Sequence, residues 1–177
     1  MKDSLFELEI RQEHAQDFPA IYDVNTKSFG RKEEARLVDR LRLSEAFVPE
    51  LSLIAIVDDK VVGHILFSII SIVEGEHIDV SLALAPVAVT PDWQGKGIGS
   101  RLIRYGLDKA KQLGYRSAFV LGHSAYYPKF GFKPSVRWGI RPPFNVPSEV
   151  FMAIELVEGS LSCTKGEVRY AKEFAEL

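Results

Sequence analysis

Hydrophobic positions along the chain follow two spacings, and each predicts a kind of element. Some segments alternate apolar with polar residues or run together in valines and isoleucines, which is typical of β-strands. In others the apolar residues recur every three or four positions, which is typical of amphipathic helices. The expected strands are 6–10, 51–57, 61–70, 78–89, 117–121, 150–156 and 167–170. The expected helices are 17–30, about 32–43, and a third that follows the glycines at 95–99 and stops at Gly114.

Turn signals separate these segments. Asp17 is expected to cap the first helix and Gly30 to end it. The residues 58–60 (Asp-Asp-Lys) predict a hairpin between two apolar runs. Pro49 is expected to separate the second helix from the next strand, and Pro86 to mark a local break or bulge in a strand, because proline cannot donate to a strand ladder.

The order of these segments predicts the architecture. A strand at 78–89, a helix and a strand at 117–121 imply a right-handed parallel crossover. The stretch 124–132 is expected to form a short helix and turn, and 133–149, with four prolines, an irregular loop. With 177 residues, no repeat and no low-complexity segment, the chain is expected to be a single α/β domain over residues 1–177.

Candidate chemistry concentrates where the strand ending in Val87-Ala88-Val89 meets the third helix. The connection reads Thr-Pro-Asp-Trp and then Gln94-Gly95-Lys96-Gly97-Ile98-Gly99-Ser100. Glycine permits positive φ and lets a ligand approach the backbone. The first turn of a helix has N–H groups with no partner inside the helix, and its dipole favours anions. The sequence therefore predicts a phosphate-binding turn, to which Lys96 adds a cation.

Motif spacing narrows the ligand. A P-loop needs Ser or Thr after the lysine, but Gly97 follows Lys96, and the spacing of the glycines does not match Gly-x-Gly-x-x-Gly. Gln94, Gly97 and Gly99 do match Gln-x-x-Gly-x-Gly after an apolar strand. This resembles the pyrophosphate signature of the GNAT superfamily of N-acetyltransferases. The resemblance implies acetyl-CoA as co-substrate, no metal, and binding by Val87, Ala88, Val89, Gln94, Gly95, Lys96, Gly97, Ile98, Gly99 and Ser100.

A second motif supports the resemblance. Tyr127, Gly131 and Phe132 match the Tyr-x-x-x-Gly-Phe of the superfamily, and the surrounding Leu-Gly-His-x-x-Tyr-Tyr-x-x-Phe-Gly-Phe run is similar to a YhbS-like bacterial branch. The resemblance covers most of the chain and is most specific between 85 and 132. It implies the GNAT-like acyl-CoA N-acyltransferase fold (α/β, α+β in some schemes), with a central mixed and splayed sheet flanked by helices. It also implies that Tyr127 protonates the leaving thiolate.

Other candidate residues keep two interpretations. Tyr127 could instead be a core aromatic, although Tyr126 is the one expected to be packed. His123, at a strand end, is a second catalytic candidate that could relay a proton or be structural. His64 is expected on a sheet face, and the carboxylates at 33–34 to suit a helix N-terminus.

The sequence departs from some members of the superfamily in one respect. Those members carry a glutamate base on the strand before the glycine turn, whereas residues 82–85 here are Leu-Ala-Leu-Ala. A base from elsewhere, a water chain or a partly neutral amine must substitute. Cys163 lies far from the motifs and has no evident base, so direct transfer is expected rather than a covalent enzyme intermediate.

Composition limits the partners. Twenty-two Lys and Arg against 24 Asp and Glu give a net charge of −2, which does not support binding to bulk nucleic acid or to an anionic membrane. The N-terminus shows no secretion signal and no apolar run approaches the ~18 residues of a membrane span, so a cytoplasmic protein is expected. The single cysteine excludes an intramolecular disulfide.

The predicted activity is acetyl-CoA-dependent transfer of an acetyl group to an amine. The acceptor stays open among small amines, amino acids, aminoglycosides and protein or peptide N-termini, and the expected oligomeric state is a monomer or a homodimer. The alternative is a non-catalytic acyl-CoA-binding or sensor module on the same fold. A generic nucleotide-phosphate protein is a second rival.

Overall fold

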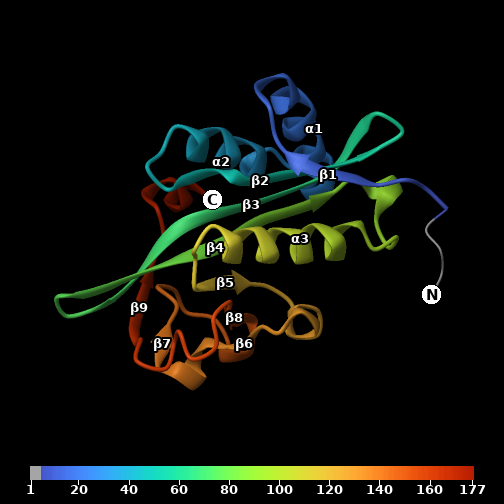
Figure 1. Cartoon of the computed structure of the whole chain (residues 1–177). Coiled ribbons are helices and arrows are strands. Elements are labelled where there is room, and N and C mark those ends of the chain that lie inside the picture. The colour runs from blue at the N-terminus through green and yellow to red at the C-terminus, as the bar shows by residue number, and fades with distance from the viewer. Residues whose placement is uncertain (1–4) are drawn as a thin grey trace.

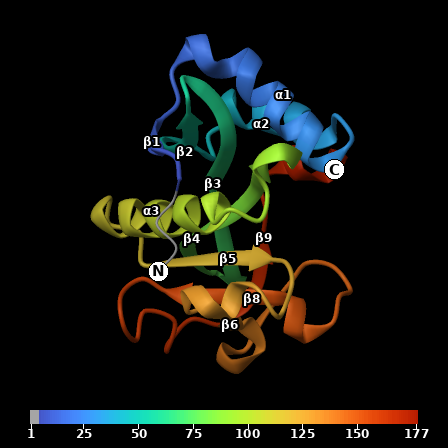
Figure 2. The same ribbon diagram turned by 90° about the vertical axis from the view of Figure 1, so that its right-hand side faces the viewer.

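The structure, a computed structural model, describes residues 5–177, and its strands join in one mixed sheet. Helices α1 and α2 pack on one face of the sheet and α3 on the other (Figures 1 and 2). The helices are α1 (Phe18–Phe29), α2 (Glu33–Arg42) and α3 (Ile98–Gln112). The strands are β1 (Glu9–Gln12), β2 (Phe47–Val57), β3 (Lys60–Glu74), β4 (His77–Val89), β5 (Ser117–Leu121), β6 (Lys133–Pro134), β7 (Ile140–Arg141), β8 (Phe151–Glu155) and β9 (Gly166–Arg169).

The sheet is splayed between β4 and β5. Its strands lie in the order β1-β2-β3-β4-β5-β8-β6, and β9 pairs with both β3 and β7. β4 and β5 are parallel and pair only at Leu82 with Ala118 and at Ala83 with Phe119. Beyond these pairs, residues 84–89 of β4 have no partner on β5, so the two strands diverge. Helix α3 is the crossover that joins them, and the predicted mixed, splayed sheet flanked by helices is confirmed.

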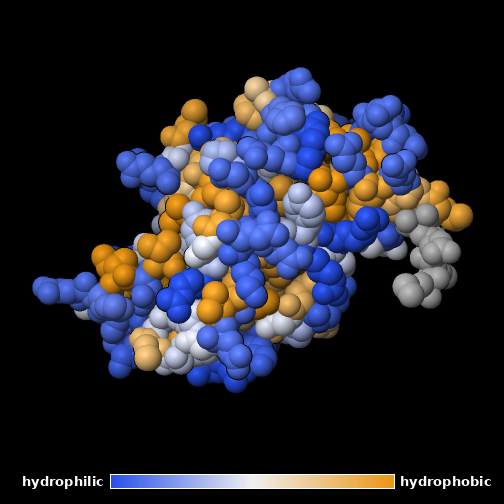
Figure 3. Space-filling model, in the orientation of Figure 1, coloured by the Kyte–Doolittle hydropathy of each residue, from blue (hydrophilic) through white to orange (hydrophobic). Residues whose placement is uncertain are grey.

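Helix α3 lies close against the sheet because one of its inner residues has no side chain. A Cβ on Gly106 would come 2.4 Å from the ring of Phe67 on β3, so the ring occupies the place of a side chain. The apolar face of the helix is buried with the main core, while Arg104 and Asp108 are exposed. Hydrophilic residues accordingly lie over the outer side of α3 in Figure 3.

Several predicted boundaries were wrong, each for a physical reason. The first strand is Glu9–Gln12 rather than 6–10, because its partner β2 turns back into a hairpin after Val57. Pro49 lies inside β2, exposed and within a shift of register, where its missing N–H is tolerated. The loop 133–149 contains β6, β7 and short 3₁₀ helices rather than irregular chain alone.

The predicted hairpin and bulge are confirmed. Asp58 and Asp59 both take positive φ, 50° and 60°, between β2 and β3. Around Pro86, Ile65 pairs with Val87 but Phe67 pairs with Leu84, so β4 has one more residue here than its partner. The peptide bond before Pro86 is cis. This bulge lies immediately before the end of β4 that faces the glycine turn.

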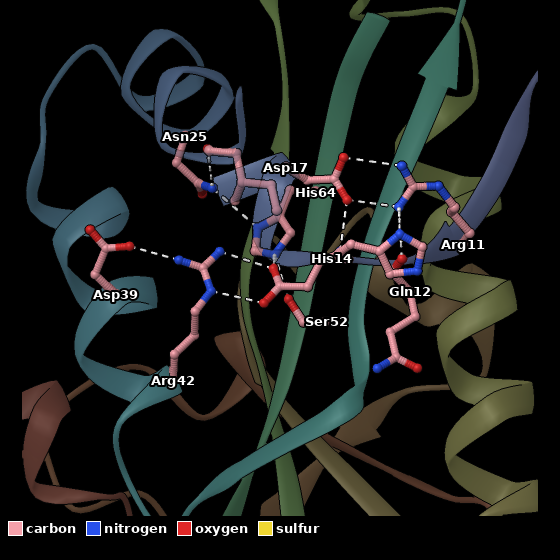
Figure 4. A network of polar contacts seen from close by, with 11 residues as sticks. Arg11, Gln12, His14, Asp17, Asn25, Asp39, Arg42, Ser52 and His64 are labelled. Atoms are coloured by element: carbon pink, nitrogen blue, oxygen red, sulfur yellow. Dashed lines mark hydrogen bonds and ion pairs between the residues drawn. The ribbon is translucent and has the colours of Figure 1, made fainter. Parts of the chain in front are cut away.

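A polar network ties the two helices of one face to the sheet (Figure 4). His64 of β3 is fully buried, and its ring nitrogens contact Ser52 Oγ at 2.9 Å and Asn25 Nδ2 at 3.1 Å. Arg42 donates two hydrogen bonds to Glu13, at 2.8 and 2.9 Å. Burial, and then the charge of Arg42, lower the pKa of His64 to about 3, so its ring is neutral. The predicted place of His64 in the sheet is confirmed.

Asp17 does not cap α1 with its side chain, as the sequence suggested. It precedes the helix, but its carboxylate accepts hydrogen bonds from Arg11, at 2.7 and 3.0 Å, and from the His14 N–H, at 2.7 Å. Arg11 is close enough to capture the carboxylate because β1 runs beside the start of the helix (Figure 4). The hydrogen bond with Arg11, more than any other contact, lowers the pKa of Asp17.

Candidate functional site

The turn between β4 and α3 depends on two glycines. Gly95 and Gly97 have φ of 75° and 84°, a region that side chains other than glycine seldom adopt. A Cβ at either position would meet no protein atom within 4 Å. The backbone conformation, and not a lack of room within the protein, therefore requires glycine here.

The first turn of α3 presents main-chain N–H groups. Gly97 is the N-cap residue, and its carbonyl accepts the N–H of Arg101 at 3.1 Å. Ile98, Gly99 and Ser100 follow as the first helical residues, whose N–H groups have no carbonyl within the helix. These donors and the positive end of the helix dipole favour a phosphate group.

Gly99 is unusual because its φ is ordinary and yet it has no side chain. A Cβ there would lie 3.5 Å from the Tyr126 hydroxyl and 3.7 Å from Val89, which are normal van der Waals distances. The protein itself would thus accept alanine, which favours helices by ~1 kcal/mol over glycine. The bare backbone at Gly99 leaves room for a ligand in the cleft to approach it closely.

The end of β4 has its polar groups fixed by three contacts. The Thr90 N–H donates to the Val62 carbonyl of β3 at 2.9 Å. Because main-chain groups alternate along a strand, the N–H and C=O of Val89 point away from β3. The Val89 N–H donates to Ser28 Oγ of α1 at 3.3 Å, and its carbonyl accepts from Gln94 Nε2 at 2.9 Å. By the same alternation, Val87 directs its N–H and C=O to the open edge between β4 and β5.

A cleft of about 430 Å³ lies in front of this turn. It contains eight of the predicted coenzyme residues: Val87, Val89, Gln94, Gly95, Gly97, Ile98, Gly99 and Ser100. The other two are not among its lining residues. Ala88 pairs with His64 of β3, and the Lys96 ammonium lies 5.6 Å from the centre of the Trp93 ring.

Four lining residues were not predicted: Ser28, Trp93, Tyr126 and Lys129. Tyr126 packs against Tyr127 and Phe130, as expected, and it also lines the cleft, where its hydroxyl contacts Ser100 Oγ at 3.2 Å. The Lys129 ammonium lies 4.0 Å from the centre of the Tyr126 ring and supplies a positive charge. Lys129 lies inside the second motif and could have been found there, whereas nothing in the sequence connects Ser28 with β4.

Tyr127 lies next to the cleft, over Gly122. A Cβ at Gly122 would come 2.2 Å from the ring, and Phe132 packs edge-on against it with ring centres 5.7 Å apart. Burial, with a smaller contribution from Tyr126, raises the pKa of Tyr127 to about 12, so the phenol keeps its proton at neutral pH. Its catalytic role stays a prediction.

His123 contributes its main chain to this region. Its carbonyl accepts the N–H groups of Tyr126 and Tyr127, at 3.1 and 3.3 Å, and so starts the short helix that carries them. The residue is exposed at the end of β5. Its role as a proton relay stays a prediction.

The residues of the cleft fit an acyl-CoA ligand. A diphosphate needs several donors in a small volume, and the first turn of α3 provides them. The bare backbone at Gly99 allows close approach, and Lys129 adds a cation. Among the described residues, no cluster of histidine, cysteine or carboxylate side chains could hold a metal ion. No helix in residues 5–177 is long and apolar enough to span a membrane.

The fold and the cleft together are typical of N-acetyltransferases. The model of the Acetyltransferase (GNAT) family matches residues 9–132, and the chain belongs to this family. The resemblance drawn from the two motifs is thereby confirmed.

Curated relatives and solved structures agree. The chain is 41% identical over 134 residues to the uncharacterized N-acetyltransferase YjhQ of Escherichia coli (strain K12), covering 75% of this chain and 74% of that protein. It is 32% identical over 166 residues to YhbS of the same strain, covering 93% and 97%. The crystal structure of E. coli YhbS in complex with CoA superposes with a TM-score of 0.89 at 29% identity, over 99% of this chain and 96% of that one. A family member from Brucella melitensis in complex with acetyl-CoA gives a TM-score of 0.78 at 32% identity, over 95% and 98%.

Proposed function

We propose that residues 1–177 form one catalytic domain that transfers an acetyl group from acetyl-CoA directly to an amine. The observation that carries the proposal is the cleft at the splay, where free helix N–H groups and the open edge of β4 meet. The two solved structures with CoA and acetyl-CoA support it, since both resemble this chain over nearly its whole length. The expected cytoplasmic location and oligomeric state stay predictions.

Each part of the cleft has a task in this proposal. The N–H groups of residues 97–100 hold the diphosphate, and Lys129 balances its charge. Val87 offers its N–H and C=O at the open edge of β4, where an amide-bearing arm pairs as an added strand. Tyr126 and Ser100 form the opposite wall. Most of the acceleration comes from holding the two reactants together.

The proposed reaction forms one bond, breaks another and moves two protons. Acetyl-CoA supplies a thioester, whose carbonyl carbon bonds the neutral amine nitrogen while the C–S bond breaks. The Tyr127 phenol donates its proton to the departing sulfur. Its raised pKa keeps the phenol protonated at neutral pH, so the proton is available. The proton lost by the amine passes to water and returns to the tyrosinate, with His123 proposed as a relay.

Calorimetry with CoA and with ATP tests the proposal. We expect CoA to bind and ATP not to bind, and acetyl-CoA to release free thiol when primary amines are added. ATP binding without CoA binding would overturn the proposal. CoA binding with no thiol release from a broad panel of amines would replace it by a non-catalytic acyl-CoA-binding module.

A further inference from the structure

A second cavity, of about 790 Å³, opens at the divergence of β4 and β5. Its lining includes Leu84 and Ala85 of β4 and Leu121 at the end of β5. The remaining walls come from the loop before β8, from β9 and from the chain that follows β9, with Phe144, Tyr170 and Phe174. None of these residues lines the 430 Å³ cleft in front of the β4–α3 turn, which we call the coenzyme cleft.

The two cavities meet β4 at neighbouring positions. The coenzyme cleft touches Val87 and the second cavity touches Ala85, two residues earlier, a separation of at most about 7 Å along a strand. On β5, Leu121 directly precedes Gly122, over which the Tyr127 ring lies. The second cavity therefore begins beside the place where the proposed function puts the reacting thioester.

The cavity is walled by a series of aromatic rings. The ring of Phe144 lies 6.0 Å from that of Phe151 and 5.9 Å from that of Tyr170, centre to centre, and Tyr170 lies 5.0 Å from Phe174. Phe144 is 40% exposed and Leu121 is 47% exposed, which leaves apolar surface open to a ligand. Burial raises the pKa of Tyr170, so its phenol is neutral. An apolar group bound here gains by leaving water.

The charges of the lining disfavour a polycation. The charged side chains in the lining are one carboxylate, Glu167, and two cations, Arg169 and Lys172. A polyamine or an aminoglycoside would bring several positive charges to a lining whose side chains include only one carboxylate, which is too few to pair with them. An amine with a single positive charge, which it must lose before attack, meets no such cost.

The outer wall is fixed to the rest of the fold. The 3₁₀ helix Lys172–Glu176 packs on α2, and Figure 2 shows the segment after β9 running to this face. Arg40 of α2 donates to the Glu173 carbonyl at 3.3 Å and pairs with Glu176 at 3.4 Å. Phe174 is thus held in position over the cavity in advance of binding.

We propose that this cavity receives the acceptor, and that the acceptor is a primary amine on an apolar, aromatic body with no second positive charge. The inference rests on the proposed function, because it places the amine nitrogen at the β4–β5 divergence beside the thioester. The aromatic body lies among Phe144, Tyr170 and Phe174. Of the acceptors that the sequence left open, this proposal favours small aromatic amines over aminoglycosides.

A matched series of probe amines tests the acceptor class. With acetyl-CoA saturating, we expect 2-phenylethylamine to give a kcat/KM at least tenfold higher than ethylamine, and spermidine and kanamycin to give lower values than either. Preferred acetylation of spermidine or kanamycin would overturn the inference and leave the proposed function standing. Absence of CoA binding in the same preparation would instead refute the proposed function.

Variants of the wall locate the site. Phe174→Ala should raise the KM for 2-phenylethylamine about tenfold, as expected for a lost apolar contact, while the KM for acetyl-CoA stays within twofold. Phe174→Leu should restore part of the affinity, which separates lost contact from an undocked segment. Val136→Ala, at a residue that is 61% exposed and outside both cavities, is the control. An unchanged KM for 2-phenylethylamine in a folded Phe174→Ala protein would overturn the inference.

Discussion

The ring of Tyr127 occupies the space that a side chain at Gly122 would fill. A Cβ there would lie 2.2 Å from Cε2 and 2.8 Å from Cδ2 of the ring. The backbone of Gly122 needs no positive φ and donates its N–H to the Val150 carbonyl at 2.9 Å. Glycine is therefore required at this position by the tyrosine ring, and the placement of the proposed acid depends on a residue with no side chain.

Gly122→Ala should displace the Tyr127 ring. We expect kcat to fall about tenfold or more, because a small misplacement of a reacting group is costly, with the CoA dissociation constant within about twofold. In a Tyr127→Ala background the same substitution should add little, since the ring it displaces is gone. Steady-state kinetics of the four proteins measures this coupling, and strictly additive effects would argue against it.

Tyr127→Phe and Tyr126→Phe separate the roles of the two phenols. Removal of a general acid costs roughly 10²-fold or more, so Tyr127→Phe should lower kcat and leave CoA affinity nearly intact. Tyr126→Phe removes the contact with Ser100 Oγ in the cleft and should chiefly weaken CoA binding. Kinetics and calorimetry on both variants decide, and a larger fall in kcat for Tyr126→Phe would reverse the assignment.

The same phenol gives a prediction for pH. Its pKa is raised to about 12, so the acid form persists through pH 10, where a free tyrosine is half ionised. We expect no loss of kcat between pH 8 and pH 10 from this group. A kcat profile that falls with an apparent pKa below 10, absent in Tyr127→Phe, would contradict the buried environment described for Tyr127.

Gly99→Ala should raise the stability of the protein and weaken its binding of CoA. Alanine fits without a clash at this helical position and should raise the free energy of unfolding by about 0.5–1 kcal/mol. Its methyl group enters the coenzyme cleft, so CoA affinity should fall tenfold or more. Denaturant unfolding and calorimetry measure the two effects.

Gly106→Ala is the matched control on the same helix. Its Cβ would meet the Phe67 ring at 2.4 Å, so it should cost about 1–3 kcal/mol of stability while the folded protein keeps its CoA affinity. Unchanged CoA affinity in Gly99→Ala would remove the reason given for a glycine at that position.

His64 makes stability depend on pH. Because its folded pKa is lowered to about 3 from 6.5, the unfolded chain takes up a proton that the folded protein does not. Its contribution is fully present above pH 6.5 and is lost as the pH falls toward 3, with a slope of about 1.4 kcal/mol per pH unit.

His64→Gln removes the titrating group, so the slope of the free energy of unfolding between pH 4.5 and 6 should fall by about that amount. His77→Gln is the control, since His77 is exposed in the β3–β4 hairpin. Denaturant unfolding at each pH measures the slope. Equal slopes in the wild type and His64→Gln would show that the buried ring does not resist protonation.

The sequence predicts the local parts of the fold well. The hairpin at 58–60, the bulge at Pro86 and the helix after the glycines each follow from residues adjacent in the chain. Contacts between distant segments leave no such signal. The pairing of β9 with the C-terminal end of β3 and the contact of Ser28 with the Val89 N–H arise only when the chain is folded.

The same limit applies to the candidate site. Gly95 and Gly97 could be identified from the sequence, because a tight turn that needs positive φ favours glycine at those positions. The packing of Tyr126 was expected from the sequence, but its place in the cleft depends on contacts with α3 that no local pattern records. The aromatic cavity draws Leu121, Phe144 and Phe174 from three separate segments, so no local pattern could predict it.

A crystal structure of this protein with acetyl-CoA would show whether the first turn of α3 holds the diphosphate. We expect diphosphate oxygens within about 2.7–3.2 Å of the main-chain nitrogens of residues 97–100, with the thioester in the splay between β4 and β5 near the Tyr127 hydroxyl. A diphosphate bound away from the first turn of α3, or a thioester outside the splay, would contradict this expectation.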